Sequence, residues 1–143
     1  MFVIAIANQK GGVGKTTTSV NLAAALGQAG QRTLLVDLDP RGNATMGAGV
    51  DKRTLKSSVY PVLLGLASLA DARVTSPHAG LDVLPANRDL AGAEVELVEI
   101  ENRENRLKKA ISECADDYDF VLIDCPPSLS LLTLNGLCAA HGV

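Results

Sequence analysis

Aromatic residues are scarce in this sequence: tryptophan is absent, and aromatic side chains make up only 3% of the 143 residues. A hydrophobic core must therefore consist of aliphatic side chains, and the 47% of apolar residues is enough to build one. A large excess of charge of one sign is also missing, since the formal net charge is −3. The adjacent basic residues Lys52 and Arg53 have no aromatic neighbours, which favours a solvated surface over a nucleic-acid-binding patch. The composition predicts an ordered globular domain rather than a disordered chain.

Cysteine is rare as well. The three cysteines are Cys114, Cys125 and Cys138, and none of them forms a C-x-x-C pair. Their odd number and their spacing argue against a disulfide framework and against a structural zinc site. Residues 1–10 lack the basic n-region of a signal peptide, and no apolar run approaches the length of a membrane span. We therefore expect a cytoplasmic protein with reduced cysteines and no membrane partner.

Short apolar runs alternate with helix-favouring segments along the chain. The runs that predict buried strands are residues 2–7, 33–36, 81–84 and 120–123. The segments that favour helices are residues 15–29, 59–70, 91–115 and 128–140. Strands that alternate with helices form parallel sheets, so we predict one α/β domain over residues 1–143, with a mainly parallel sheet flanked by helices. The sequence ends where another strand is expected, which indicates a fold cut off before its last strands; a naturally small α/β protein is the alternative.

A glycine-rich loop, NQKGGVGKTTT at positions 8–18, separates the first predicted strand from the first predicted helix. It matches the phosphate-loop pattern G-x-x-x-x-G-K-[ST], except that Gln9 stands in place of the first glycine. Its glycines allow backbone N–H groups to converge on phosphate oxygens, and the N-terminus of the following helix attracts the same anion. A turn that only starts a helix is the alternative, but the position between strand and helix favours a nucleotide site. The predicted phosphate-binding residues are Gly11, Gly12, Val13, Gly14, Lys15, Thr16 and Thr17.

Three side chains of this loop have predicted roles. Lys15 supplies a positive charge to the β- and γ-phosphates, and Thr16 offers its hydroxyl group to Mg²⁺. Lys10 is a second lysine at the outer edge of the loop, from which it could reach the nucleotide of a second subunit. A solvated surface lysine is the alternative for Lys10, and the spacing alone does not decide between the two.

Acidic residues follow two of the predicted strands. Asp37 and Asp39 come directly after residues 33–36, and paired carboxylates near a phosphate loop can hold Mg²⁺ through water or orient an attacking water. Asp124 follows residues 120–123 in the Walker B form, in which a carboxylate at a strand end faces the Mg²⁺ shell. The alternatives are a turn role for the first pair and a chance strand-end position for Asp124.

These three segments together resemble the deviant Walker A ATPases, and most specifically the ParA/Soj proteins of chromosome and plasmid partitioning. The segments that match are KGGVGKTTT (residues 10–18), VDLDPRGNAT (36–45), LPANRDLAGAEVEL (84–97) and LIDCPPSL (122–129). The match runs along essentially the whole chain, and the sequence departs from the pattern at Arg41, where glutamine is more usual.

The resemblance implies a P-loop NTPase fold and an ATPase that uses ATP and Mg²⁺. Two monomers would close around two ATP molecules as a homodimer, with Lys10 on the partner's phosphates and Gly11 where the two loops meet. Lys10, Lys15 and Asp39 would be catalytic, with Asp39 positioning the attacking water. Thr16, Asp37 and Asp124 would serve the metal. The dimer would bind DNA non-specifically, and a ParB-like centromere-binding protein would stimulate hydrolysis.

Other functions remain open at this stage. A truncated module that binds nucleotide without hydrolysing it is one alternative. A MinD-like membrane-cycling ATPase is another, because the family domain continues beyond residue 143, where its amphipathic membrane helix would lie. The resemblance also places much of the adenine pocket and the DNA-binding surface in that missing part. The nitrogenase iron protein shares the deviant loop, but Cys125 lies in a "DCPP" sequence that resembles the partitioning proteins rather than a cluster ligand.

Overall fold

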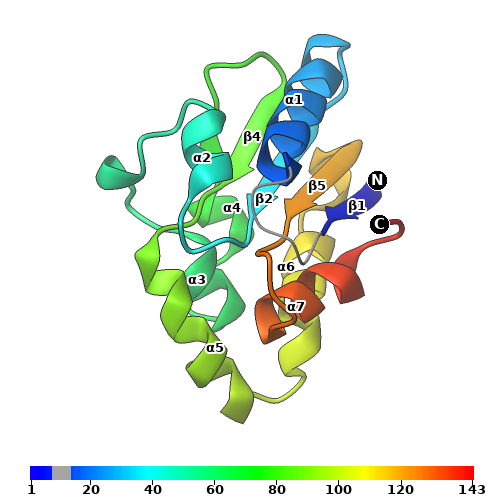
Figure 1. The fold of residues 1–143 in the computed structure, drawn as a ribbon. Coiled ribbons are helices and arrows are strands. Elements are labelled where there is room, and N and C mark those ends of the chain that lie inside the picture. Colours follow the sequence, from blue (N-terminus) through cyan, green and yellow to red (C-terminus); the bar gives the residue numbers. More distant parts are fainter. Residues whose placement is uncertain (8–13) are drawn as a thin grey trace.

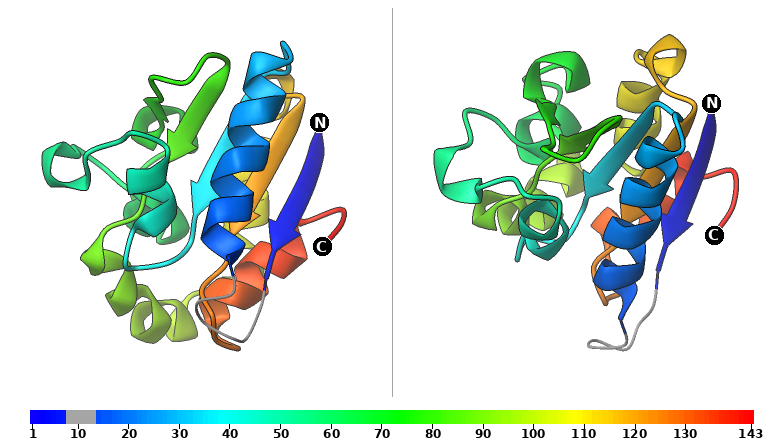
Figure 2. Two further views of the ribbon diagram at one scale, coloured as in Figure 1. Left: turned by 45° about the horizontal axis from the view of Figure 1, so that its top comes forward. Right: turned by 90° about the horizontal axis from the view of Figure 1, so that it is seen from above.

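A five-stranded sheet forms the centre of the computed structural model, which describes residues 1–7 and 14–143 (Figures 1 and 2). In spatial order the strands are β1 (Phe2–Ile6), β5 (Phe120–Asp124), β2 (Thr33–Asp37), β4 (Leu81–Leu84) and β3 (Val74–Thr75). The pairs β1–β5, β5–β2 and β2–β4 are parallel, and β3 pairs antiparallel with β4. The predicted α/β fold with a mainly parallel sheet is confirmed.

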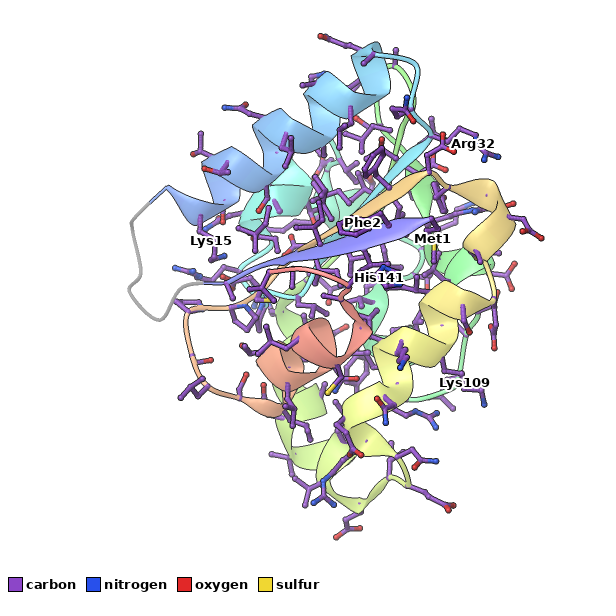
Figure 3. All side chains as sticks on the ribbon, turned by 90° about the vertical axis from the view of Figure 1, so that its right-hand side faces the viewer. Met1, Phe2, Lys15, Arg32, Lys109 and His141 are labelled. Atoms are coloured by element: carbon purple, nitrogen blue, oxygen red, sulfur yellow. The ribbon has the colours of Figure 1, made fainter. Side chains whose placement is uncertain are left out.

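Helices cover both faces of this sheet, as the view toward β1 shows (Figure 3). The helices on one face are α1 (Lys15–Gln28) and α2 (Asn43–Gly47). The helices on the other face are α3 (Val59–Leu63), α4 (Leu69–Ala72), α5 (Ala93–Glu96), α6 (Arg106–Ser112) and α7 (Leu131–Ala139). Short 3₁₀ turns lie at Lys52–Thr54, Arg88–Gly92, Leu97–Glu99, Arg103–Asn105 and Ala115–Asp117. Within the described residues, no helix has the length and apolar character that a membrane crossing requires.

The two-residue period of the strands divides the core into two aliphatic clusters. Leu35 and Leu122 pack with residues of α1 and α2, whereas Leu34 packs with the helices of the opposite face. Asp37 lies two residues after Leu35, and Asp124 lies two residues after Leu122. Both carboxylates therefore lie on the face that α1 covers. The hydrophobic pattern of β2 and β5 therefore determines which helix the two acidic side chains meet.

The predicted strands agree with the structure to within one residue at each end. β4 has the predicted bounds, and β2 and β5 each extend by one residue to include Asp37 and Asp124. β3 has no counterpart among the predicted elements, because two residues are too short for a periodic pattern.

The predicted helical segment 59–70 forms the two helices α3 and α4. Two other predicted helices differ from the observed ones in their bounds or continuity. The segment 91–115 is broken, because Ile100 is extended and Asn102 adopts a left-handed conformation with φ 56°. The predicted helix 128–140 begins only at Leu131, where Ser130 caps the first turn. Glu94 fixes the same end of α7, since its carboxylate accepts hydrogen bonds from the N–H groups of Leu131 and Leu132 at 3.0 and 3.2 Å.

The segment that follows α7 runs beside the outer side of β1. Gly142 forms a parallel bridge with Ile4, and its carbonyl accepts a hydrogen bond from Ala5 N at 2.9 Å. His141 stacks on the ring of Phe2 with 5.5 Å between ring centroids (Figure 3). The first and last described segments therefore lie side by side.

Candidate functional site

The site predicted from the sequence lies at the carboxyl ends of β2 and β5, where parallel strands place ligand-binding residues. In the register of these strands Asp37 lies directly beside Asp124. Gly14 precedes α1 with φ 80°, a left-handed conformation that favours glycine. This turn directs the first turn of α1 toward the end of β5.

Asp124 is the centre of the hydrogen-bond network. It is fully buried, and three side chains of α1 donate to its carboxylate. Lys15 Nζ lies 3.0 Å from Oδ1, Ser19 Oγ lies 2.8 Å from Oδ1, and Thr16 Oγ1 lies 3.1 Å from Oδ2. A buried carboxylate requires such partners, because an unpaired charge away from water is strongly destabilising. The contact therefore joins the predicted phosphate loop to the predicted Walker B residue.

Lys15 and Thr16 retain binding capacity in this arrangement. The side chain of Lys15 is 8% exposed, so little of it faces solvent. The ammonium group has three donors, and a phosphate can compete with Asp124 for them. The hydroxyl group of Thr16 donates to Asp124, which leaves its oxygen lone pairs for a cation. Thr17 is exposed on the same first turn.

Asp37 uses its carboxylate to connect separate segments of the fold. Its Oδ1 accepts a hydrogen bond from Asp39 N at 3.0 Å. Its Oδ2 accepts from the backbone N–H and the hydroxyl group of Thr45 at 2.9 and 2.7 Å. Burial raises the pKa of Asp37 to about 6, although the hydrogen bonds from Thr45 and Asp39 oppose this shift. In this arrangement its side chain joins the end of β2 to the following loop and to α2.

Asp39 is buried under Arg41. Burial disfavours the charged form of Asp39, but the hydrogen bonds and charge of Arg41 outweigh it and lower the pKa of the carboxyl group. The positive charge of Lys15 acts in the same direction. Asp39 therefore remains ionised at neutral pH.

The structure thus gathers Lys15, Thr16 and Asp124 into one cluster, with Asp37 beside it in the sheet. Lys10, Gly11, Gly12 and Val13 lie outside the described residues, and their roles stay predictions.

Two residues that bind the carboxylates of Asp124 and Asp37 are not among the residues predicted from the sequence. Ser19 lies four residues after Lys15, so helical spacing places both side chains on one face of α1. This spacing could have identified Ser19 once Asp124 was assigned to the site. Thr45 lies within the segment VDLDPRGNAT, but its contact with Asp37 depends on the path of the loop and has no local signal.

The cluster fits a magnesium ion that takes some of its ligands from the protein and the others from a bound phosphate. Among residues 1–7 and 14–143, no group of three or more His, Cys, Asp or Glu side chains could hold a metal ion. Mg²⁺ is commonly bound by one or two protein oxygens together with phosphate oxygens and water. Thr16 and Asp124 are oxygen donors of this kind, so the residues present suit a metal that arrives with a nucleotide.

Cys125 follows Asp124 but is unsuited to metal binding. Its side chain is fully buried against α7. Burial raises the pKa of the thiol to about 12, and the charge of Asp124 adds to the shift. A thiolate is the form that binds metals, so this environment disfavours a cluster ligand.

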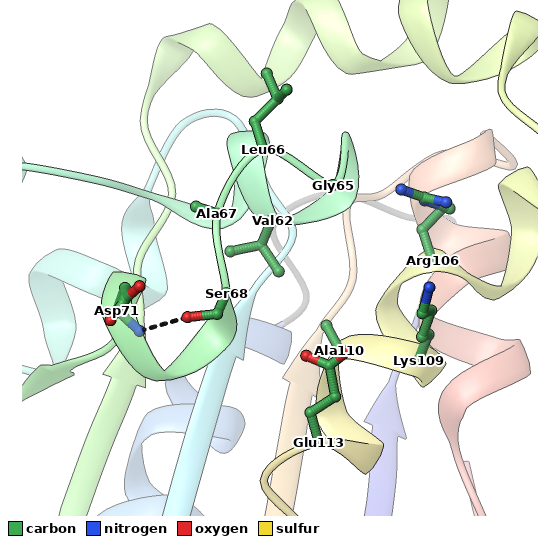
Figure 4. A pocket seen from close by; sticks show the side chains of 10 residues that line it. All are labelled: Val62, Gly65, Leu66, Ala67, Ser68, Asp71, Arg106, Lys109, Ala110 and Glu113. Atoms are coloured by element: carbon green, nitrogen blue, oxygen red, sulfur yellow. Dashed lines mark hydrogen bonds between the residues drawn. The ribbon is translucent and has the colours of Figure 1, made fainter.

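A pocket lies away from these residues, between α6 and the segment that joins α3 to α4 (Figure 4). Its volume is about 400 Å³. Arg106 and Lys109 contribute positive charge to its rim, and Asp71 and Glu113 contribute negative charge. None of the predicted site residues lines it, and its mixed charge gives no preference for an anion.

Comparison with protein families and sequences finds relatives that match along the whole chain. A family model described as an AAA domain matches residues 1–143. The chain is 53% identical over 141 residues to the sporulation initiation inhibitor protein Soj of Bacillus subtilis. It is 52% identical over 141 residues to the chromosome partitioning protein ParA of Myxococcus xanthus. These alignments cover 99% of the chain but 56% and 50% of the relatives, so the chain spans about half the length of the curated relatives it matches.

Solved structures share the fold. A crystal structure of cobyrinic acid a,c-diamide synthase from Mycobacterium smegmatis with bound ADP and magnesium superimposes with a TM-score of 0.95 at 52% identity. The match covers 99% of this chain and 57% of that chain. A plasmid partition protein from Borrelia burgdorferi superimposes with a TM-score of 0.85 at 27% identity, over 97% of this chain and 62% of that chain.

Proposed function

We propose that this chain, which belongs to the ParA/Soj family of partitioning ATPases, binds ATP with Mg²⁺ and hydrolyses it as a switch in chromosome or plasmid segregation. The observation that carries the proposal is the contact of Lys15, Thr16 and Ser19 with the buried carboxylate of Asp124. It joins a phosphate-binding helix end to a metal-binding carboxylate. Magnesium and ADP in the related solved structure support the choice of ligands.

Lys15 is the residue that would bind the β- and γ-phosphates. Its ammonium group exchanges Asp124 for phosphate oxygens, and the N–H groups at the start of α1 add backbone donors to the same anion. Asp124 then needs another positive partner, because it stays buried. Thr16 and Asp124 would hold Mg²⁺ at this point, and Asp37 would support it from the neighbouring strand. The metal ion neutralises charge that develops on the phosphates during transfer.

Asp39 would orient the attacking water. It is ionised, and it lies two residues after Asp37, whose strand position is directly beside Asp124. A carboxylate in that position accepts a hydrogen bond from water and aligns it for attack. Hydrolysis to ADP and phosphate follows.

The assembly belongs to the proposal through the family resemblance. The chain would act within an ATP-sandwich homodimer in which Lys10 reaches the partner's phosphates. The dimer would bind DNA non-specifically in the cytoplasm, on the nucleoid, and a ParB-like protein would stimulate hydrolysis. The names of the related proteins support a partitioning role.

The decisive experiment measures ATP binding and phosphate release by the full-length protein, with Mg²⁺ and with EDTA. We expect Mg²⁺-dependent hydrolysis in the wild type. Lys15→Ala should lose ATP affinity at least about tenfold, because the charge that binds the phosphates is removed. Lys108→Ala, an exposed lysine on α6, is the matched control and should bind normally. Unchanged affinity in Lys15→Ala would contradict the site, and ATP binding without phosphate release would favour the non-hydrolysing alternative.

A further inference from the structure

We infer that Arg41 restrains Asp39 and thereby slows the attack of water on ATP. This inference rests on the proposed function, in which Asp39 orients the water. Arg41 is thus a positioning residue that acts on the reaction only through another side chain.

The contact between the two residues uses both oxygens of the carboxylate. Asp39 Oδ1 accepts from the backbone N–H of Arg41 at 3.0 Å and from its Nε at 3.1 Å. Asp39 Oδ2 accepts from Nε at 3.2 Å and from Nη2 at 2.6 Å. A carboxylate has about four lone-pair positions. Arg41 therefore occupies most of the acceptor capacity that a water molecule would need.

Burial of the two partners is strongly unequal. The side chain of Asp39 is 3% exposed, whereas that of Arg41 is 58% exposed. The carboxylate is held inside the site, but the guanidinium group can turn away into solvent or toward an external anion. A side-chain movement of Arg41 at the surface therefore frees Oδ2 and leaves only the backbone N–H of Arg41 on Oδ1.

A second Asp–Arg pair in the chain makes the same kind of contact away from the candidate site. Arg53 binds Asp51 with the same two-residue spacing and with backbone, Nε and Nη2 donors. Both side chains of that pair are exposed, at 85% and 42%. Exposed ion pairs of this kind contribute little. The burial of its carboxylate distinguishes the Asp39–Arg41 pair.

The restrained step is the hydrolysis itself. The water oxygen bonds to the γ-phosphorus, the bond from phosphorus to the bridging oxygen breaks, and ADP keeps the electron pair. Hydrogen phosphate forms, and one proton passes to solvent. Asp39 aligns the water for this attack, and it does so when its oxygens are not all engaged by Arg41.

Steady-state ATP hydrolysis of the full-length protein with Mg²⁺ tests the inference. Arg41→Gln should raise kcat roughly threefold to tenfold and leave KM nearly unchanged, because it removes a partly solvated ion pair that is not part of ATP binding. Arg41→Lys keeps the charge but loses the two-point contact, so its kcat should lie between those of the wild type and Arg41→Gln. Arg53→Gln is the matched control and should hydrolyse ATP at the wild-type rate.

Asp39→Ala supplies the double-mutant cycle. In that background Arg41→Gln should no longer change kcat, because the residue acts only through Asp39. An unchanged or lower kcat in Arg41→Gln, or an increase that persists without Asp39, would overturn the inference while wild-type hydrolysis continued. Absence of hydrolysis from the wild type and every variant would overturn the proposed function and the restraint together.

A readout independent of hydrolysis separates the contact from the catalysis. Arg41 Nε–H donates to Asp39, so its exchange with solvent, followed by ¹⁵N NMR, should be slower than that of Arg53. Asp39→Ala should remove this protection. Equal exchange of the two arginines in the wild type would show that Arg41 does not hold Asp39.

Discussion

Thr45 connects three segments of the fold through a single hydroxyl group. The hydroxyl donates to Asp37 at 2.7 Å and accepts a hydrogen bond from Ala86 N at 3.0 Å. The end of β2, the helix α2 and the segment after β4 therefore meet at one buried residue. The same hydroxyl stabilises the ionised form of Asp37, whose pKa burial raises from 3.8 to about 6.

Thr45→Val should lower the free energy of unfolding by ~1–3 kcal/mol, because Ala86 N and Asp37 each lose a buried partner. The folded-state pKa of Asp37 lies above its ordinary value of 3.8, so protonation of Asp37 stabilises the fold. That contribution is complete below pH 3.8 and is lost as the pH rises through about 6. The loss in Thr45→Val should therefore be larger above the pKa of Asp37, where the hydroxyl binds a charged acceptor.

Urea unfolding of the full-length protein on both sides of this pKa measures the effect. Thr45→Ser keeps the hydroxyl group and is the control, with a smaller loss that depends little on pH. An equal loss for Thr45→Val at both pH values would show that Asp37 is not stabilised through this hydroxyl group.

At the scale of single elements, α7 packs closely against the strand that carries Asp124. A Cβ atom on Gly136 would lie 2.7 Å from Cys125 Sγ and 3.3 Å from side-chain atoms of Ile123 and Leu38. A glycine is needed here because helix and strand approach so closely. The approach positions the turn between β5 and α7 beside the site.

Gly136→Ala should destabilise the protein by ~1–3 kcal/mol through overpacking, even though alanine favours helix formation more than glycine. The Tm from thermal unfolding of the full-length protein measures this. Gly142→Ala is the control, because its nearest new contact would be an ordinary one of 3.6 Å with Phe2. A Tm for Gly136→Ala at or above that of the wild type would mean that the interface can relax.

The elements differ in how well the sequence predicts them, and the reason is physical. β2, β4 and β5 are largely buried apolar runs, so burial and pattern agree. The segment 91–115 has a helix-favouring composition throughout, but it is interrupted at Asn102, whose backbone is left-handed with φ 56°.

The candidate site was predictable to a similar extent. Parallel topology alone brings Lys15 and Asp124 to one sheet edge, so this contact could be expected. The contact of Thr45 with Asp37 depends on the path of the loop after β2, which no local pattern encodes.

At the scale of the whole molecule, the predicted functional residues that the structure describes lie at the carboxyl ends of the strands. β2 and β5 end there side by side, and α1 starts there. The rest of the fold supports this edge from both faces. A second copy that closed over it would cover the bound phosphates and exclude water.

Lys10→Ala should therefore bind ATP as a monomer but fail to form ATP-dependent dimers, because the proposed contact with the partner's phosphates is lost. Light scattering after size-exclusion chromatography, with ATP and Mg²⁺, measures the mass of the full-length protein. Lys56→Ala, an exposed lysine away from the predicted loop, should dimerise as the wild type does. Normal dimers of Lys10→Ala would contradict a role in trans.

The pairing of Gly142 with Ile4 has a consequence for self-association. Strands at the margin of a sheet offer unpaired backbone groups to other chains and can seed aggregation. His141 and Gly142 bind the backbone groups of Val3 and Ala5, so the flank of β1 is already shielded. Another chain could pair with these groups of β1 only after His141 and Gly142 had been displaced from them.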